Sequence, residues 1–230
     1  MNFTSFRWWH RKLGLVFVIF AVMASVSGLL HVWMAHNQEP PPRPVPHGAT
    51  LSLESKLLPL EQAAKSLPAD EKPIVGVNLR VIQDRTVFVF WRESRATPVY
   101  VDAKTGEFLP DFDEVYAAEI ASRFFGGKPV KKSEYLTKFN REYIAIFRIL
   151  PVYRMEVGDD LGTRLYVSTK TEGVTRHTDN QRQFEADFFS LIHKFMFIPN
   201  KTAREWTLIT GTAGILLVSL LGLGLYFRKR

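Results

Sequence analysis

Two of the six histidines stand where an imidazole could do chemistry. His31 lies at the end of a long apolar run, and His193 lies in an aromatic-rich segment shortly before a second apolar run. An ionisable residue at membrane depth suggests a functional role, and two imidazoles at one depth can serve as axial ligands of a b-type haem. The alternative is that both are interfacial histidines whose ring nitrogens face water. His31 and His193 are therefore candidate cofactor ligands.

Other residue types offer less chemistry. His10 lies at the opposite end of the first apolar run without a histidine partner, so it could ligate a haem only with a second chain. The absence of cysteine excludes disulfides and thiolate metal sites. No phosphate-binding loop, dinucleotide fingerprint or HExxH pattern is present, and neither His177 nor Ser168 belongs to a recognisable hydrolase set. We therefore expect no catalytic residue and no metal site.

Two apolar runs must position these histidines, at residues 13–35 and 204–227. About 20 apolar residues cross a bilayer core of about 30 Å, and only a helix satisfies their backbone groups there. The first run is longer than the apolar core of a signal peptide, about 7–15 residues, and lacks a small-x-small cleavage site. This favours an uncleaved anchor over a signal peptide. The sequence predicts two transmembrane helices.

Small residues repeat along one face of each predicted span. In the first they are Ala21, Ala24, Ser25 and Gly28, and in the second Gly211, Gly214, Ser219 and Gly222. Small residues three or four apart let helix backbones approach closely in lipid. We expect the two spans to pack together through these faces, or to pack on a partner.

The basic residues that flank the spans explain most of the formal charge of +7. They are Arg7, Arg11, Lys12, Arg228, Lys229 and Arg230. Without them the chain is nearly neutral, which argues against a nucleic-acid partner. Basic flanks stay in the cytoplasm, so residues 1–12 and 228–230 are predicted cytoplasmic tails. Both termini then lie in the cytoplasm, the two spans cross a bacterial inner membrane, and the middle of the chain lies in the periplasm.

Four segments are predicted between the spans. Residues 36–50 form a proline-rich linker with the extended stiffness of polyproline II. Residues 51–110 and 111–181 form two lobes of mixed helix and strand. Residues 182–199 form an amphipathic helix that rests at the membrane surface.

Each lobe is predicted to contain one helix followed by antiparallel strands, which makes the fold class α+β. The helices are expected at 58–66 and from Asp111 to Gly126-Gly127, with Asp111 and Glu114 as a capping box. Alternating apolar residues predict strands at 75–81, 86–92, 99–102, 130–138, 143–157 with a break at Pro151, and 163–168. The stretch 99–106 is similar to 165–173, since each has an apolar-Tyr-Val strand and a Lys-Thr turn. We therefore expect an internal repeat, with Tyr100 and Tyr166 at equivalent positions.

Several of these stretches resemble one family. VYVDAKTGEF at 99–108 and LPVYRMEVGDD…LYVSTKTEGVTRH at 150–177 resemble the PepSY domain. RWWHRKLGLVFVIFAVMASVSGLLH at 7–31 and FFSLIHKFMF with the last span resemble the anchors of the PepSY-associated transmembrane family. The resemblance covers nearly the whole chain and implies two PepSY-like helix-plus-antiparallel-sheet lobes inserted between two transmembrane helices.

The chain departs from that family in two respects. Its second turn has Ser168 and Thr171-Glu172 where the first has Asp102 and Thr105-Gly106. It also has only two predicted spans, whereas larger members have four or more, function in siderophore and iron handling, and in some cases carry haem. PepSY modules also occur in protease propeptides, where they bind and restrain a protease.

The resemblance implies two functions. The first is a non-enzymatic inner-membrane protein that presents a periplasmic interaction domain, requires no cofactor, and is accessory to a membrane or periplasmic protein or to a second copy of itself. The second is a b-type haem-binding electron-transfer component of iron or siderophore reduction or uptake.

Overall fold

The computed structural model of the chain describes residues 3–37, 50–51, 56–69, 72–93, 95–147 and 149–228. Most of the predicted proline-rich linker, at 38–49, and residues 229–230 of the predicted last tail lie outside this described part. The chain divides into two compact units. One contains residues 1–39 and 181–230, and the other contains residues 40–180.

The first unit consists of three helices, α1 (Phe3–Asn37), α4 (Asn180–His193) and α5 (Lys201–Arg228). Helices α1 and α5 are both long and apolar enough to cross a membrane. Each helix is longer than the predicted span. Helix α1 continues through the described part of the predicted first tail, and α5 begins at Lys201, before the predicted start at residue 204. At about 1.5 Å per residue α1 is roughly 50 Å long, so it exceeds a bilayer core of about 30 Å.

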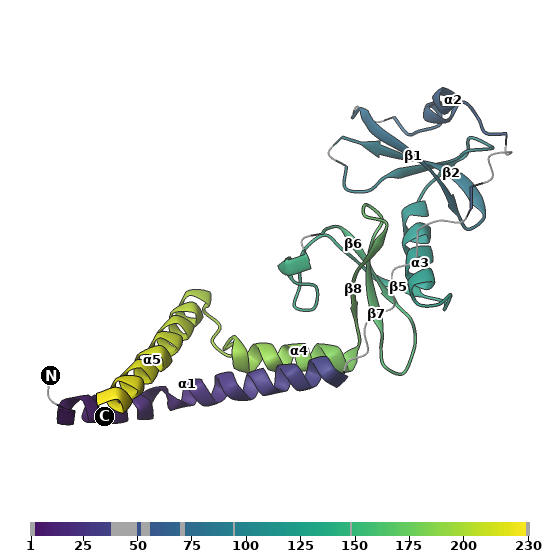
Figure 1. The fold of residues 1–230 in the computed structure, drawn as a ribbon. Coiled ribbons are helices and arrows are strands. Elements are labelled where there is room, and N and C mark those ends of the chain that lie inside the picture. The colour runs from purple at the N-terminus through teal and green to yellow at the C-terminus, as the bar shows by residue number, and fades with distance from the viewer. Residues whose placement is uncertain are drawn as a thin grey trace. The chain divides into compact units, whose positions relative to one another are not determined.

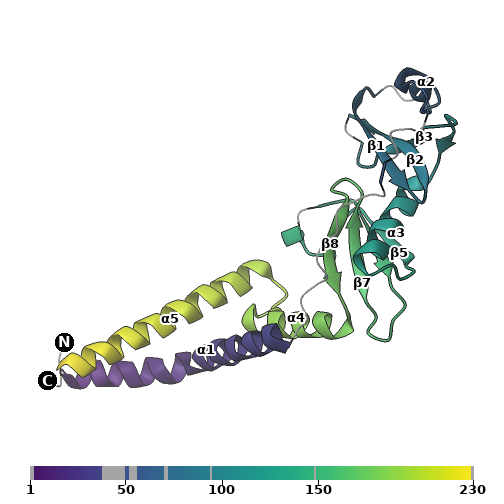
Figure 2. The same ribbon diagram turned by 45° about the vertical axis from the view of Figure 1, so that its right-hand side comes forward.

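Aromatic side chains of α1 rest on glycines of α5. The rings of Phe17 and Phe20 lie so close to Gly214 and Gly211, respectively, that a Cβ on either glycine would overlap them. The further pairs are His10 with Gly222 and Phe6 with Gly224. Residue numbers rise along α1 as they fall along α5, so the two helices are antiparallel. Figure 2 accordingly shows both chain termini at the same end of the pair.

This packing corrects part of the expectation from the small residues. The glycines of α5 do provide a close helix contact, but α1 contributes mainly aromatic rings to it, together with Gly14, where an added Cβ would lie 3.8 Å from Val218. A Cβ added at Gly28 would have no neighbour within 4 Å. The physical reason is one of volume, because a large ring fills the groove above a glycine better than a second small residue does.

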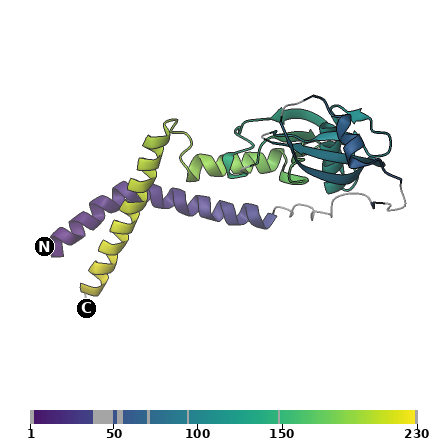
Figure 3. The same cartoon turned by 90° about the horizontal axis from the view of Figure 1, so that it is seen from above.

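Helix α4 lies beside the second half of α1 (Figures 1 and 3). Contacts between the two helices run from His31 with Phe189 to Ser27 with His193. The predicted amphipathic helix at 182–199 is thus shorter than expected, since α4 ends at His193 and Phe195 takes a positive φ of 51°. Asn200 then caps α5, because its side-chain oxygen accepts a hydrogen bond from the Ala203 amide at 2.9 Å.

The second unit contains two antiparallel sheets of four strands each, so the α+β class with two sheets is confirmed. In the first sheet, α2 (Leu60–Lys65) precedes β1 (Ile74–Ile82), β2 (Arg85–Arg92), β3 (Val99–Asp102) and β4 (Phe108–Leu109). In the second, α3 (Phe112–Phe124) precedes β5 (Lys131–Leu136), β6 (Val152–Glu156), β7 (Arg164–Ser168) and β8 (Gly173–Thr178), with a short 3-10 turn at Ala145–Phe147. Each sheet is a meander in chain order.

Helix α3 lies between the two sheets and packs against both (Figures 1 and 2). Its buried residues Tyr116, Ala117 and Ile120 belong to one core with strands of the first and second sheets. Helix α2 covers the opposite face of the first sheet, where Ala63 packs near Val99 and Val101. The lobes are therefore joined through a shared core.

Tyr100 and Tyr166 occupy equivalent positions in the two sheets. Each lies in the third strand, and each points away from the helix that precedes its own sheet. Tyr100 packs in the core shared with α3, while the flanking Val99 and Val101 face α2. Tyr166 packs in a separate cluster with Tyr143, while its own neighbours in β7 face α3. The repeat is thus visible in strand order and in side-chain direction.

The start and the end of α3 differ in how well the sequence predicted them. Gly126 and Gly127 end the helix as expected, with φ of 72° and 83° and amide hydrogen bonds back to Arg123 and Ser122. The predicted capping box at Asp111 is wrong. Asp111 has φ of 58° and makes no side-chain cap, because a sharp turn separates it from β4 and a capping side chain requires extended backbone. Glu114 pairs with Lys132 instead.

Candidate functional site

The histidines predicted as ligands lie on facing stripes of α1 and α4. Ser27 and His31 are four residues apart on α1, and Phe189 and His193 are four residues apart on α4. Residues at this spacing share one face of a helix. Because α1 and α4 are antiparallel along this stretch, the two stripes face each other and the four side chains form one cluster.

The contacts in this cluster run from His31 to Phe189, from Phe189 to His193, and from His193 to Ser27. The ring of Phe189 lies 5.2 Å from that of His31 and 4.7 Å from that of His193, centroid to centroid. The second pair is nearly parallel, at 13°. Nδ1 of His193 lies 2.9 Å from the hydroxyl of Ser27. The structure therefore brings His31 and His193 into one cluster, in which the ring of Phe189 contacts both.

The hydrogen bonds of Ser27 indicate the tautomer of His193. The Ser27 hydroxyl donates its proton to the carbonyl of Ala24 at 2.9 Å, so its oxygen accepts the proton of His193 Nδ1. Nε2 of the neutral ring is then left as a hydrogen-bond acceptor. Ser27 is itself fully buried, which fixes this side of the imidazole.

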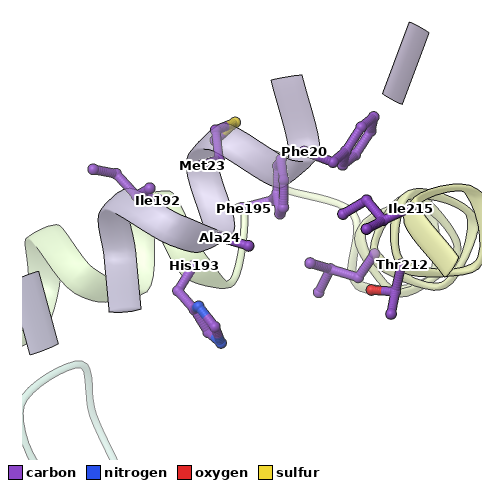
Figure 4. A pocket seen from close by; sticks show the side chains of 9 residues that line it. Phe20, Met23, Ala24, Ile192, His193, Phe195, Thr212 and Ile215 are labelled. Carbon is purple, nitrogen blue, oxygen red and sulfur yellow. The ribbon is translucent and has the colours of Figure 1, made fainter. Parts of the chain in front are cut away.

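A small cavity adjoins His193 at the point where the three helices of this unit meet (Figure 4). Its volume is about 110 Å³. Its lining is formed by Phe20, Met23, Ala24, Ile192, His193, Phe195, Leu208, Thr212 and Ile215. In Figure 4 the imidazole points away from the aromatic pair Phe20 and Phe195, whose ring centroids are 5.7 Å apart. The cavity is therefore mostly apolar.

This arrangement does not fit a haem held between His31 and His193. The ring of Phe189 packs against both imidazoles, so a porphyrin between the two histidines would have to displace it. The adjoining cavity is also well below the roughly 300–1,000 Å³ that enclose an organic ligand. As placed, the two imidazoles are linked through an aromatic stack and not through a shared open site.

His10 has a packing role in the helix pair. Its Nδ1 lies 3.1 Å from the carbonyl oxygen of Val218, and a carbonyl can only accept, so Nδ1 carries a proton. The same ring lies on Gly222. His10 thus links α1 to the backbone of α5. A side chain at position 222 of α5 would leave too little room for the imidazole ring.

Two polar pairs connect the lobes of the second unit. Arg80 of β1 makes a double hydrogen bond to Glu172, with Nε and Nη2 at 2.9 and 3.0 Å from the carboxylate oxygens. The hydroxyl of Tyr100 donates to Asp113 of α3 at 2.7 Å. Burial raises the pKa of Asp113, although hydrogen bonds that include that of Tyr100 oppose the rise. Glu172 is one of the positions at which the second turn departs from the first.

A third polar cluster lies on the outer face of the second sheet. Glu142 accepts hydrogen bonds from Tyr166 at 2.5 Å and from Nε of Arg164 at 2.8 Å. Burial acts to raise the pKa of Glu142, but hydrogen bonds from Arg164 and Tyr166 outweigh it and leave this pKa below its usual value. Arg164 also donates to Asn180 Oδ1 at 2.6 Å and to the carbonyl of Asp179. It therefore ties the sheet to the two residues that follow β8.

The other polar residues considered in the sequence have structural surroundings. The ring of His177 packs against Phe124 and Phe125 at about 6 Å. The hydroxyl of Ser168 accepts a hydrogen bond from the amide of Thr171 at 3.4 Å, in the place where Asp102 accepts two such bonds in the first turn. Within the described residues, no group of three histidine or acidic side chains lies close enough to hold a metal ion.

Sequence reasoning missed Ser27 and Phe189 because it considered histidines by type and depth. The i+4 spacing of each with a candidate histidine was the signal that could have identified them. It also missed Arg80, Glu142 and Arg164, since pairs that lie far apart in the sequence leave no local pattern.

Comparison of the chain with models of known protein families, with curated proteins and with solved structures finds no match. The resemblance to the PepSY-associated transmembrane family therefore remains a prediction from the quoted stretches of sequence.

Proposed function

We propose that this chain is a non-enzymatic bacterial inner-membrane protein whose domain at 40–180 binds a partner protein in the periplasm. Two apolar helices support the membrane anchorage, and their antiparallel packing is compatible with both termini in the cytoplasm. The basic flanks favour that orientation. The PepSY-like sequence favours a binding role, since such modules act by contact.

The observation that carries this proposal is a difference between the two edge strands β1 and β5. They are equivalent in the repeat, because each is the first strand of its sheet and each contains one register shift. Strand β5 begins Lys-Lys-Ser-Glu, with charged side chains that discourage pairing with another strand. Strand β1 is nine residues long and its only charged residue, Arg80, is engaged by Glu172.

The apolar start of β1 makes it suitable for strand addition. Ile74 and Val75 are 41% and 64% exposed, and among the described strands β1 pairs only with β2. An extended segment of a partner would gain backbone hydrogen bonds along β1, and pockets for its alternate side chains would supply specificity. The proposed partner therefore presents an extended, apolar segment.

Photo-crosslinking of the full chain in cells tests this contact. A photoreactive phenylalanine analogue is placed at Val75, and as a matched control at Ser133 on the equivalent edge β5. We expect a specific adduct from position 75 only, and its loss when Ile74→Lys adds a charge to the same edge. Its mass distinguishes another protein from a second copy of this chain. Equal adducts from both edges, or an adduct that survives Ile74→Lys, would contradict the proposal.

The alternative proposal is a b-type haem-binding electron-transfer component of iron or siderophore reduction. It is supported by the presence of His31 and His193 in one cluster, but it requires Phe189 to move away from both rings. An absorption spectrum of detergent-purified protein separates the two functions. A Soret band that is lost in both His31→Ala and His193→Ala would favour haem, whereas a folded protein without the band would favour the binding module.

A further inference from the structure

The first turns of α1 form a hollow that contains three basic residues and a tryptophan. Thr4, Arg7, Trp8, Arg11, Lys12 and Leu15 line it, and its volume is about 440 Å³. This volume lies in the range of roughly 300–1,000 Å³ that is typical of ligand sites. The six positions recur at intervals of three or four residues, so they share one broad face of the helix.

The charge on this face favours an anion. The first acidic residue of the chain is Glu39, so every charged residue among residues 1–38 is basic. Among the described residues, the structure shows no ion pair for Arg11 or Lys12. A phosphate group close to the helix would therefore meet the cations of Arg11 and Lys12, and Arg7 lies on the same face.

The same face continues as an exposed aliphatic stripe. Leu15, Val18 and Val22 follow Arg7 and Arg11 at spacings of three or four residues, and all three are at least half exposed to the surroundings of the helix. Trp8 lies within the basic part, between Arg7 and Arg11, and an aromatic ring of this kind prefers the headgroup level of a membrane. The face thus combines a basic part that suits an anionic headgroup with an aliphatic part that suits an acyl chain.

We propose that this face binds one anionic phospholipid. Its phosphate contacts Arg7, Arg11 and Lys12, and one acyl chain lies along Leu15, Val18 and Val22. A soluble phosphate compound would use only the basic part and leave the aliphatic stripe bare. This inference rests on the membrane anchorage in the proposed function, but it does not depend on the partner-binding role of β1.

Native mass spectrometry of the full chain in detergent tests the site. The probes are phosphatidylglycerol and phosphatidylcholine with identical acyl chains. We expect tighter binding of phosphatidylglycerol. Each cation near a membrane surface contributes about a fivefold preference, so Arg7→Gln with Arg11→Gln should weaken this binding by roughly 25-fold. The double variant Arg7→Lys with Arg11→Lys keeps the charge and should retain most of the binding, which separates charge from folding.

A matched control is Lys201→Gln, which removes an exposed cation at the start of α5 and should leave lipid binding unchanged. Three results would overturn the proposal. They are equal binding of the two lipids, an equal loss in Lys201→Gln, and displacement of phosphatidylglycerol by an equal concentration of glycerol phosphate, which would identify a site for phosphate alone. Each is independent of the crosslinking result at Val75.

Discussion

Asp113 and Glu142 each accept a hydrogen bond from the tyrosine of an equivalent strand, yet their pKa values shift in opposite directions. Asp113 is deeply buried, and one of its oxygens has no hydrogen-bond partner, so desolvation raises its pKa. Glu142 is also desolvated, but Arg164 donates to it and holds its pKa low. The opposite directions of the two pKa shifts therefore follow from the guanidinium of Arg164, which lies next to Glu142 and not next to Asp113.

The raised pKa predicts how Asp113→Asn changes the pH dependence of stability. An acid whose folded pKa exceeds its unfolded pKa destabilises the folded state above the folded pKa, by about 1.4 kcal/mol for each pH unit between those two pKa values. The variant should thus be at least as stable as the wild type near pH 7. Its advantage should shrink as the pH falls through the raised pKa, as measured by urea unfolding of the full chain in detergent followed by circular dichroism.

Glu142→Gln is the matched control, and the expected sign is opposite. A lowered folded pKa stabilises the wild type above the unfolded pKa, and that stability is lost as the pH falls through the folded pKa. If both variants shifted with pH in the same direction, the assignment of Asp113 as a desolvated carboxyl would be wrong.

At the scale of elements, the contact between α1 and α5 depends on two glycines beneath aromatic rings. Gly214→Ala places a methyl group where the ring of Phe17 lies, and overpacking of this kind costs about 1–3 kcal/mol. We expect the melting temperature of the full chain in detergent to fall. Gly28→Ala serves as the control, because open space surrounds that position. Equal effects of the two substitutions would show that the helices do not pack as described.

The pair Arg80 and Glu172 connects the two lobes, and a double-mutant cycle measures its contribution. Both side chains are partly buried and doubly bonded, so we expect a coupling energy of about 1.5–3 kcal/mol. The exposed pair Lys65 and Glu61 on α2 is a suitable reference, with about 0.3–0.5 kcal/mol expected. Coupling at Arg80 no larger than in this reference would mean that the lobes are joined by the apolar core only.

The sequence predicted elements well where a local pattern is strong. Apolar alternation located β2 and β3, and Gly126-Gly127 located the end of α3. It failed at β8, whose residues Gly173–Thr178 include polar side chains without clear alternation, because pairing with β7 and not composition makes this segment a strand. The site followed the same rule. The two histidines were found by type, whereas the contact of Phe189 with both depends on how two helices meet.

For the whole molecule, the antiparallel helix pair predicts that both termini lie on one side of the membrane. Reporter fusions at residue 50 and at the C-terminus should therefore report opposite sides, with the C-terminus in the cytoplasm because of its basic flank. Activity of a periplasmic reporter, such as alkaline phosphatase, and of a cytoplasmic one, such as a fluorescent protein, gives the readout. The same side for both fusions would contradict the pairing of α1 with α5 across a bilayer.

The position of the glycines in α5 has a consequence for the timing of biosynthesis. Phe17 and Phe20 are made near the start of translation, but Gly214 and Gly211 are made about 190 residues later. At roughly 5–20 residues per second, this delay is about 10–40 s. Until then the ribosome has produced α1 without its partner, so its aromatic rings face lipid or a protein of the insertion machinery. Assembly of the anchor is therefore a late step, completed only after the domain at 40–180 has been synthesised.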